Sequence, residues 1–88
     1  MGHLSENELK DRIERASALT PGDRYVHYRM PDQPYVIVAV GLLEENEEPA
    51  VVYKALYGEG LIWIRSLSNF LEEVEQEGVK VSRFKKIS

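Results

Sequence analysis

The chain has 88 residues, of which 43% are apolar and none is cysteine. A chain of this length supports one modest hydrophobic core, so we expect a single domain covering residues 1–88. The lack of cysteine excludes a disulfide framework, a cysteine zinc site, an iron–sulfur cluster and a catalytic thiol.

The formal net charge is −4, from 15 acidic and 11 basic side chains. Four of the acids are concentrated in residues 44–48, so the rest of the chain is balanced. Because binding to a phosphate backbone requires a basic face, this balance disfavours nucleic acid as a partner. No apolar run reaches the about 20 residues that a membrane span needs, and no signal-peptide pattern follows Met1. These features predict a protein that has no membrane partner, and they allow a location in a reducing cytoplasm.

A helix is predicted over about Glu6–Ala18. Its apolar residues recur at intervals of three and four, and a Ser-x-x-Glu capping box begins at Ser5. A proline and a glycine at positions 21 and 22 end the pattern. The apolar stripe must cover the rest of the domain or pair with a second copy of the chain, and it consists of Leu9, Ile13 and Ala16.

Beyond this helix, apolar and polar residues alternate with the period of two that is typical of β-strands. We predict strands at Arg24–Arg29, Tyr35–Leu43, Ala50–Tyr57, Leu61–Arg65, Leu71–Glu75 and Val79–Phe84. Turns are expected at residues 31–34, 44–49, 58–60 and 77–78, with one helical turn in Ser66–Phe70 and a frayed tail at residues 85–88. The short connections make neighbouring strands antiparallel. The expected fold is mostly β (α+β), a small antiparallel SH3-like partly open β-barrel of five to six strands with one N-terminal helix.

The β region carries a distinctive string, VVYKALYG at residues 51–58, followed by Trp63-x-Arg65. Together with Tyr25–Tyr28 and Ser82–Phe84, this string resembles a bacterial family called domain of unknown function 1653, over about residues 21–84. The chain departs from the family pattern at residues 29–30, at residue 66 and in the length of the first loop. No activity is established for the family, so the resemblance implies a cytoplasmic bacterial protein and no mechanism.

Residues two apart on a strand share a face, which sorts the side chains that carry chemistry. Tyr53 and Tyr57 lie together on one strand. Trp63 and Arg65 lie together on the next. If the aliphatic residues on the opposite faces form the core, the aromatic ones are exposed; these aliphatic residues are Val52, Leu56, Ile62 and Ile64. The alternative is that the N-terminal helix covers the aromatic side chains.

An exposed set of Tyr, Trp and Arg is typical of a recognition surface, because these side chains combine apolar area with a polar tip. The candidate ligand-binding residues are His27, Tyr53, Tyr57, Trp63, Arg65 and Arg83. The leading hypothesis is therefore a non-catalytic binding module whose partner is a peptide, a protein or a small ligand. For Arg65, exposure predicts a role in binding, whereas pairing with a buried carboxylate or contact with the turn at residues 66–70 predicts a role in stability.

Two alternatives belong to other classes of function. One is a small enzyme that uses His27 as a general base beside Tyr53 or Tyr57, although no nucleophile motif accompanies this histidine. The other is a structural protein that dimerises through its N-terminal helix. Because the acidic segment lacks the spacing of a calcium loop, we predict no metal ligand, and we name no cofactor and no catalytic residue.

Overall fold

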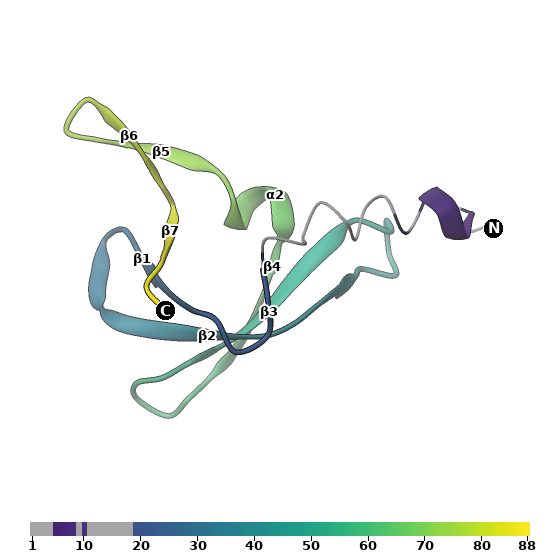
Figure 1. Cartoon of the computed structure of the whole chain (residues 1–88), viewed down its shortest axis with the longest axis horizontal. Coiled ribbons are helices and arrows are strands. Elements are labelled where there is room, and N and C mark those ends of the chain that lie inside the picture. The colour runs from purple at the N-terminus through teal and green to yellow at the C-terminus, as the bar shows by residue number, and fades with distance from the viewer. Residues whose placement is uncertain (1–4, 9, 11–18) are drawn as a thin grey trace.

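The computed structural model describes residues 5–8, 10 and 19–88 of the chain (Figure 1). Residues 6–8 and 10 are helical, and the Ser5 hydroxyl accepts the Glu8 N–H at 3.3 Å, as the capping box predicts. The apolar stripe of the predicted helix (Leu9, Ile13 and Ala16) lies outside the described residues, and so does a dimer built on it.

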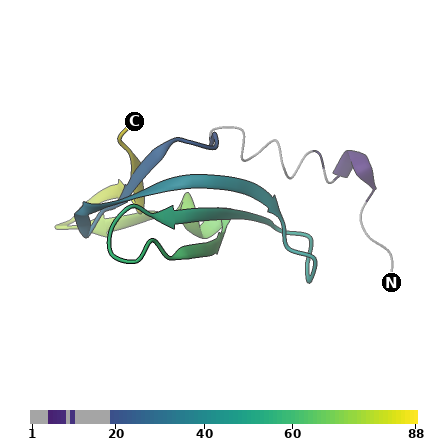
Figure 2. The same cartoon turned by 90° about the horizontal axis from the view of Figure 1, so that it is seen from below.

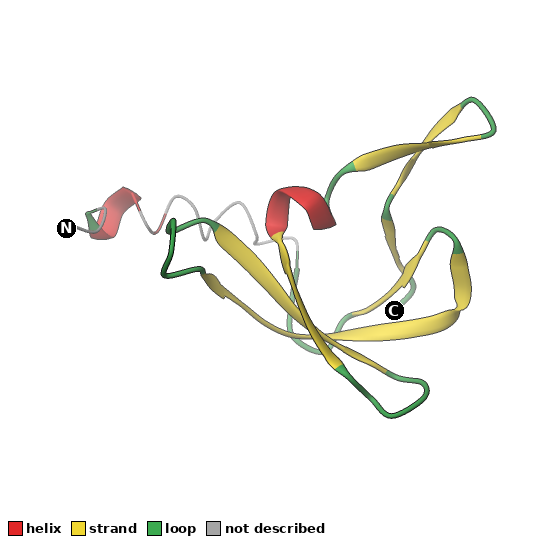
Figure 3. Ribbon diagram, turned by 180° about the vertical axis from the view of Figure 1, so that it is seen from behind, coloured by secondary structure: helices red, strands yellow, loops and turns green. Residues whose placement is uncertain are grey.

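Most of the described chain is β-strand (Figure 3). In chain order the elements are β1 (Arg24–His27), β2 (Met30–Leu42), β3 (Pro49–Ala55), β4 (Ile62–Ser66), α2 (Leu67–Phe70), β5 (Glu73–Gln76), β6 (Val79–Ser82) and β7 (Phe84–Lys86). Five strands form one antiparallel sheet in the order β4-β3-β2-β1-β7, and β5 and β6 form a separate hairpin. The mostly β, antiparallel fold class is thus confirmed.

The large sheet is open, with β4 at one edge and β7 at the other. Closure into a barrel would require these two edge strands to be joined by hydrogen bonds, and no such pairing is present among the described strands. Figure 2 shows the strands edge-on as an open, twisted layer. The SH3-like barrel predicted from the sequence is therefore not confirmed.

The strand β2 begins at Met30, five residues before its predicted start, so the expected turn at residues 31–34 is wrong. The chain reverses instead at residues 28–29, and β1 pairs with the early part of β2. The register shifts from Val26 opposite Pro34 to His27 opposite Met30, so residues 31–33 have no partner in the ladder with β1. Irregular positions of a sheet tolerate proline, and Pro31 lies within this stretch.

The C-terminal tail is not frayed, because its last residues form β7 and lie beside β1. His27 lies opposite Phe84, and the Arg24 N–H donates to the Ser88 carbonyl at 2.8 Å. The predicted strand Val79–Phe84 is therefore divided at Arg83 into β6 and β7. This second half leaves the hairpin and joins the large sheet (Figure 1).

The core lies on one face of the sheet, which we call the inner face. Val51, Tyr53 and Ala55 of β3 are at most 4% exposed there. They pack with residues of β1, β2, α2, β7 and the segment before β1, and this core cluster contains Leu19, Tyr25, Ile37, Val51, Tyr53, Leu67, Phe70 and Phe84.

Of the two arrangements considered from the sequence, the one with an aliphatic core is wrong. Ile62 and Ile64, which would form that core, are 61% and 65% exposed on the opposite, outer face, whereas Tyr53 is 4% exposed. The period of two correctly grouped the side chains, but the inner face is the one that α2 and β7 cover. In the described residues, no helix is long and apolar enough to cross a membrane.

Candidate functional site

Phe84 of β7 is the centre of an aromatic cluster on the inner face. Its ring stacks on that of Phe70 in α2, with centroids 4.2 Å apart and planes within 3° of parallel. Tyr53 of β3 meets both rings edge-on, at 5.6 and 5.5 Å between centroids. The cluster therefore brings β3, α2 and β7 into contact, although these segments are separated in the sequence.

Arg65 of β4 is positioned by this cluster. Its Nε donates to the Tyr53 hydroxyl at 3.1 Å, and its Nη1 donates to Oδ1 of Asn69 in α2. The guanidinium carbon lies 5.2 Å from the centroid of the Phe84 ring, which is a cation–π contact. Arg65 thus contacts the helical turn, which predicts a role in stability, and it is also partly exposed, so this contact does not exclude a role in binding. No carboxylate of the described residues lies within ion-pair distance of Arg65.

Tyr35 of β2 extends the cluster toward the end of β3. Its hydroxyl and that of Tyr57 are 2.5 Å apart, and its ring meets Tyr53 edge-on at 5.1 Å. Burial, together with the hydrogen bond to Tyr57, raises the pKa of Tyr35 to about 12. At neutral pH this side chain is therefore a neutral hydrogen-bonding group.

Trp63 of β4 lies directly opposite Tyr53 of β3, so its side chain is on the inner face. It lies at the rim of the cluster, because it is 49% exposed. A pocket of about 230 Å³ lies beside it, lined by Ala55, Tyr57, Gly58, Glu59, Leu61 and Trp63. Tyr57, Trp63 and Arg65 thus form a partly exposed surface, which we call the Trp63 surface.

His27 of β1 lies on the other side of Phe84, with ring centroids 5.2 Å apart. Its Nδ1 accepts the Arg29 N–H at 3.2 Å, which leaves Nε2 to carry the proton of the neutral ring. Burial lowers the pKa of His27, and Arg65, Arg83 and Arg29 lower it further. The ring also contacts Tyr28 at 4.8 Å, whereas the enzyme hypothesis expected Tyr53 or Tyr57 beside it.

A second, larger pocket of about 500 Å³ lies on the His27 side of the molecule, next to the hairpin. Apolar and polar side chains both line it, and the lining consists of Val26, His27, Tyr28, Pro31, Gln76, Val81, Ser82 and Lys85. No group of three or more His, Asp or Glu side chains within residues 5–8, 10 and 19–88 is arranged to hold a metal ion.

Arg83 is separate from the Trp63 surface. Its Nη2 lies 3.4 Å from Oε1 of Glu72, and its backbone N–H donates to the Glu72 carbonyl at 2.9 Å. Its Nε is buried and has no hydrogen-bond partner among the described residues. Arg83 therefore anchors the start of the hairpin to β7.

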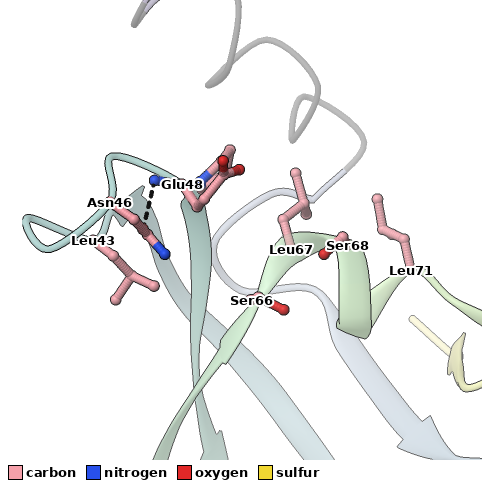
Figure 4. A pocket seen from close by; sticks show the side chains of 8 residues that line it. Leu43, Asn46, Glu48, Ser66, Leu67, Ser68 and Leu71 are labelled. Carbon is pink, nitrogen blue, oxygen red and sulfur yellow. Dashed lines mark hydrogen bonds between the residues drawn. The ribbon is translucent and has the colours of Figure 1, made fainter. Parts of the chain in front are cut away.

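A third pocket, of about 280 Å³, lies between the β2–β3 turn and α2 (Figure 4). In Figure 4, Leu43, Asn46 and Glu48 lie on one side, and the residues of α2 face them from the other. The Asn46 side chain accepts the Glu48 N–H at 3.0 Å, which orders the turn. None of the residues that line this pocket was among the candidate ligand-binding residues named from the sequence.

Three residues that shape the Trp63 surface were also missed from the sequence: Tyr35, Asn69 and Phe84. Tyr35 and Phe84 were assigned to strands, but nothing local indicated that their rings meet. The pairing of β7 with β1 brings them together, and it depends on contacts between the two ends of the β region.

The family model described as Protein of unknown function (DUF1653) matches residues 23–86. No curated protein and no solved structure matches the chain at a significant level. The matched segment contains all strands from β1 to β7, together with the aromatic cluster and the Trp63 surface. The chain therefore belongs to this family of proteins of unknown function.

Proposed function

We propose that this chain is a non-catalytic binding module of the bacterial cytoplasm, and that its Trp63 surface binds an extended peptide or protein segment bearing a carboxylate. One observation carries the proposal. Arg65 is held by two neutral groups, Tyr53 and Asn69, beside the half-exposed Trp63, and no carboxylate of the described residues pairs with it.

The chemistry of arginine favours a carboxylate as the ligand group. A guanidinium has five N–H donors, of which Tyr53 and Asn69 use one each. The planar fork binds a carboxylate through two parallel hydrogen bonds. Because Arg65 is already oriented, less side-chain entropy is lost when a ligand binds.

The aromatic neighbours favour a peptide over an isolated small anion. Trp and Tyr contribute much of the free energy of protein recognition when they lie beside a pocket. Trp63 and Tyr57 both line the 230 Å³ pocket, which has room for one side chain, and Arg65 lies two residues from Trp63 on the same strand. Small SH3-like β-domains commonly bind extended peptides on such aromatic faces. The proposal includes a relationship between this chain and those domains.

The test is a selection of linear peptides from a random display library on the immobilised full-length chain, followed by titration of the purified peptides. Trp63 is the single tryptophan, so its fluorescence reports on the site directly. We expect micromolar binding that weakens at least about tenfold, or about 1.4 kcal/mol, in Trp63→Ala. Ile62→Ala is the matched control, because Ile62 is the adjacent residue, 61% exposed on the outer face.

The carboxylate is tested separately. Replacing each Asp or Glu of a selected peptide by its amide should weaken binding to the wild-type chain, and it should have much less effect on Arg65→Lys, which has lost the planar fork. Peptides that bind Trp63→Ala as tightly as the wild type would contradict the proposal, and so would a library that yields no binder.

A further inference from the structure

The edge strand β4 exposes apolar side chains on both faces of the sheet. The consecutive residues Leu61, Ile62, Trp63 and Ile64 are 55%, 61%, 49% and 65% exposed. Edge strands are usually protected from association by charges, prolines or bulges. Between residues 61 and 66, Arg65 is the single charged residue and proline is absent.

The backbone of β4 is also available for pairing. The Ala55 N–H donates to the Leu61 carbonyl at 2.9 Å, so these two residues form a hydrogen-bonded pair. Such pairs alternate along an antiparallel ladder, so Trp63 also directs its N–H and C=O toward β3. The N–H and C=O groups of Ile62 and Ile64 consequently point toward the open edge, where they can pair with another strand.

The opposite edge of the sheet is different. The strand β7 has three residues, two of which are the exposed Lys85 and Lys86. Lysines on a short edge strand oppose pairing with another chain. The β7 edge is therefore short and positively charged, whereas the β4 edge is apolar and suited to association with another chain.

We propose that two copies of this chain pair antiparallel along β4, with Trp63 of each copy opposite Trp63 of the other. In this register Ile62 of one copy and Ile64 of the other exchange backbone hydrogen bonds, because both direct their N–H and C=O groups outward. The two Trp63 side chains occupy a non-hydrogen-bonded pair, in which side chains approach most closely. Arg65 then faces Leu61 of the second copy, so no like charges are opposed.

The register explains why a second copy fits this edge. A strand that pairs with itself about a two-fold axis must present complementary residues in both directions. Here the isoleucines match isoleucines on the outer face, and tryptophan matches tryptophan on the inner face. In this register each exposed apolar side chain of residues 61–64 gains a neighbour on the second copy, and Leu61 lies against the aliphatic part of Arg65.

Charge supports the antiparallel orientation. Ser66 of β4 pairs with Ala50 of β3, so the acidic turn at residues 44–48 lies at the Ser66 end of β4. Antiparallel pairing places the two acidic turns at opposite ends of the joined sheet. The negative charge of each copy is thereby kept away from that of the other.

The size of the contact predicts its strength. Pairing along β4 joins one strand of each copy, which is a smaller contact than the about 1,200–2,000 Å² of a standard stable interface. We therefore expect a weak dimer and a monomer–dimer equilibrium that depends on concentration. Pairing also places the two Trp63 surfaces side by side, although the dimer itself does not depend on their binding a ligand.

Sedimentation of the full-length chain across a concentration series tests the dimer. We expect the average mass to rise from that of a monomer toward that of a dimer. Ile64→Lys should weaken association at least about tenfold, because it places two new positive charges at the seam. Val79→Lys is the matched control, since Val79 is 61% exposed on the hairpin strand β6. It should leave association unchanged.

Amide hydrogen exchange supplies a second readout that needs no substitution. The Trp63 amide should exchange slowly at all concentrations, whereas those of Ile62 and Ile64 should become protected only as the dimer forms. A chain that stays monomeric up to about 1 mM would overturn the proposal. A dimer that survives Ile64→Lys would also overturn it, as would one that leaves the Ile62 and Ile64 amides unprotected.

Discussion

The two faces of the five-stranded sheet are both rich in apolar side chains, but only one of them is buried. On the inner face, Val51 is fully buried and Tyr53 is 4% exposed. On the outer face, Ile64 lies opposite Val52 and is 65% exposed. The contrast shows that hydrophobicity alone did not select the core of this protein.

The inner face differs from the outer face because the hydroxyl groups of its tyrosines have hydrogen-bond partners. The Tyr53 hydroxyl accepts from Arg65, and the Tyr35 hydroxyl is bonded to that of Tyr57. A buried hydroxyl without a partner costs about 1–3 kcal/mol, so these bonds permit tyrosines to be buried. The aliphatic outer face needs no such partners, but no described element of the chain covers it.

The largest expected effect comes from truncating the centre of the inner face. Phe84→Ala removes the ring that stacks on Phe70 and contacts Tyr53, so unfolding should become easier by about 3–5 kcal/mol. Urea denaturation measures this change. Phe84→Leu, with a smaller loss, keeps the comparison measurable if the alanine variant does not fold.

Ile64→Ala is the matched change on the outer face. Measured at a concentration low enough to keep the chain monomeric, it should alter the free energy of unfolding by less than about 0.5 kcal/mol. Equal losses for Phe84→Ala and Ile64→Ala would mean that the two faces are equally buried in solution, which would break the comparison.

The next effect concerns Arg65, which links the inner face to α2. Arg65→Ala removes two hydrogen bonds and leaves the buried Tyr53 hydroxyl without this partner, so we expect a loss of about 2 kcal/mol in stability. Tyr53→Phe should cost about 1 kcal/mol. The double variant should show a coupling of about 1 kcal/mol, because both changes remove the same bond.

Arg24→Ala is the control for this cycle, since Arg24 is an exposed arginine of β1. Its stability should remain within about 0.5 kcal/mol of the wild type. Additive effects of Arg65→Ala and Tyr53→Phe would show that the hydrogen bond contributes little, and that Arg65 acts mainly through Asn69 or through a ligand.

Much of the fold could be predicted from local sequence, because strands and turns depend on nearby residues. The turn at Glu77-Gly78 has positive φ at both positions, 54° and 82°, as a two-residue hairpin loop requires. The first residues of β2 and of β7 were predicted incorrectly, because both positions depend on how these strands pair with β1. That pairing joins His27 to Phe84, which are distant in sequence.

The candidate site was predicted less well for a related reason. The period of two correctly placed Tyr53, Trp63 and Arg65 on one face, and the hydrogen bond from Arg65 to Tyr53 confirms that grouping. It could not indicate which face would be covered, because α2 and β7 decide that. An aliphatic core was one of two arrangements that the sequence allowed, and the hydrogen-bonded tyrosines occupy the core instead.

A smaller effect on the free energy of unfolding is expected at alkaline pH, and it comes from Tyr35 on the inner face. The pKa of Tyr35 is raised to about 12 in the folded chain, against 10.0 for an unperturbed tyrosine. The unfolded state therefore loses its proton first, and this contribution to stability is lost as the pH rises from about 10 to about 12. Tyr35→Phe should remove that part of the pH dependence, which urea denaturation at several alkaline pH values measures. An unchanged alkaline slope in this variant would contradict the assignment.

The smallest effect is expected at acidic pH and concerns His27, at the far side of the aromatic cluster. Burial lowers its pKa below 6.5, and Arg65, Arg83 and Arg29 lower it further, because a protonated ring would lie near three positive charges. As the pH falls below about 6.5, the unfolded chain takes up this proton before the folded chain does, so stability declines until the folded pKa is reached. Above about pH 6.5 the contribution is complete.

His27→Gln should flatten the dependence of unfolding on pH between 5 and 7, and the other histidine, present in both proteins, cancels from the difference. If His27→Gln instead leaves the acidic slope intact, the His27 ring is more open to water than its contacts with Phe84 indicate.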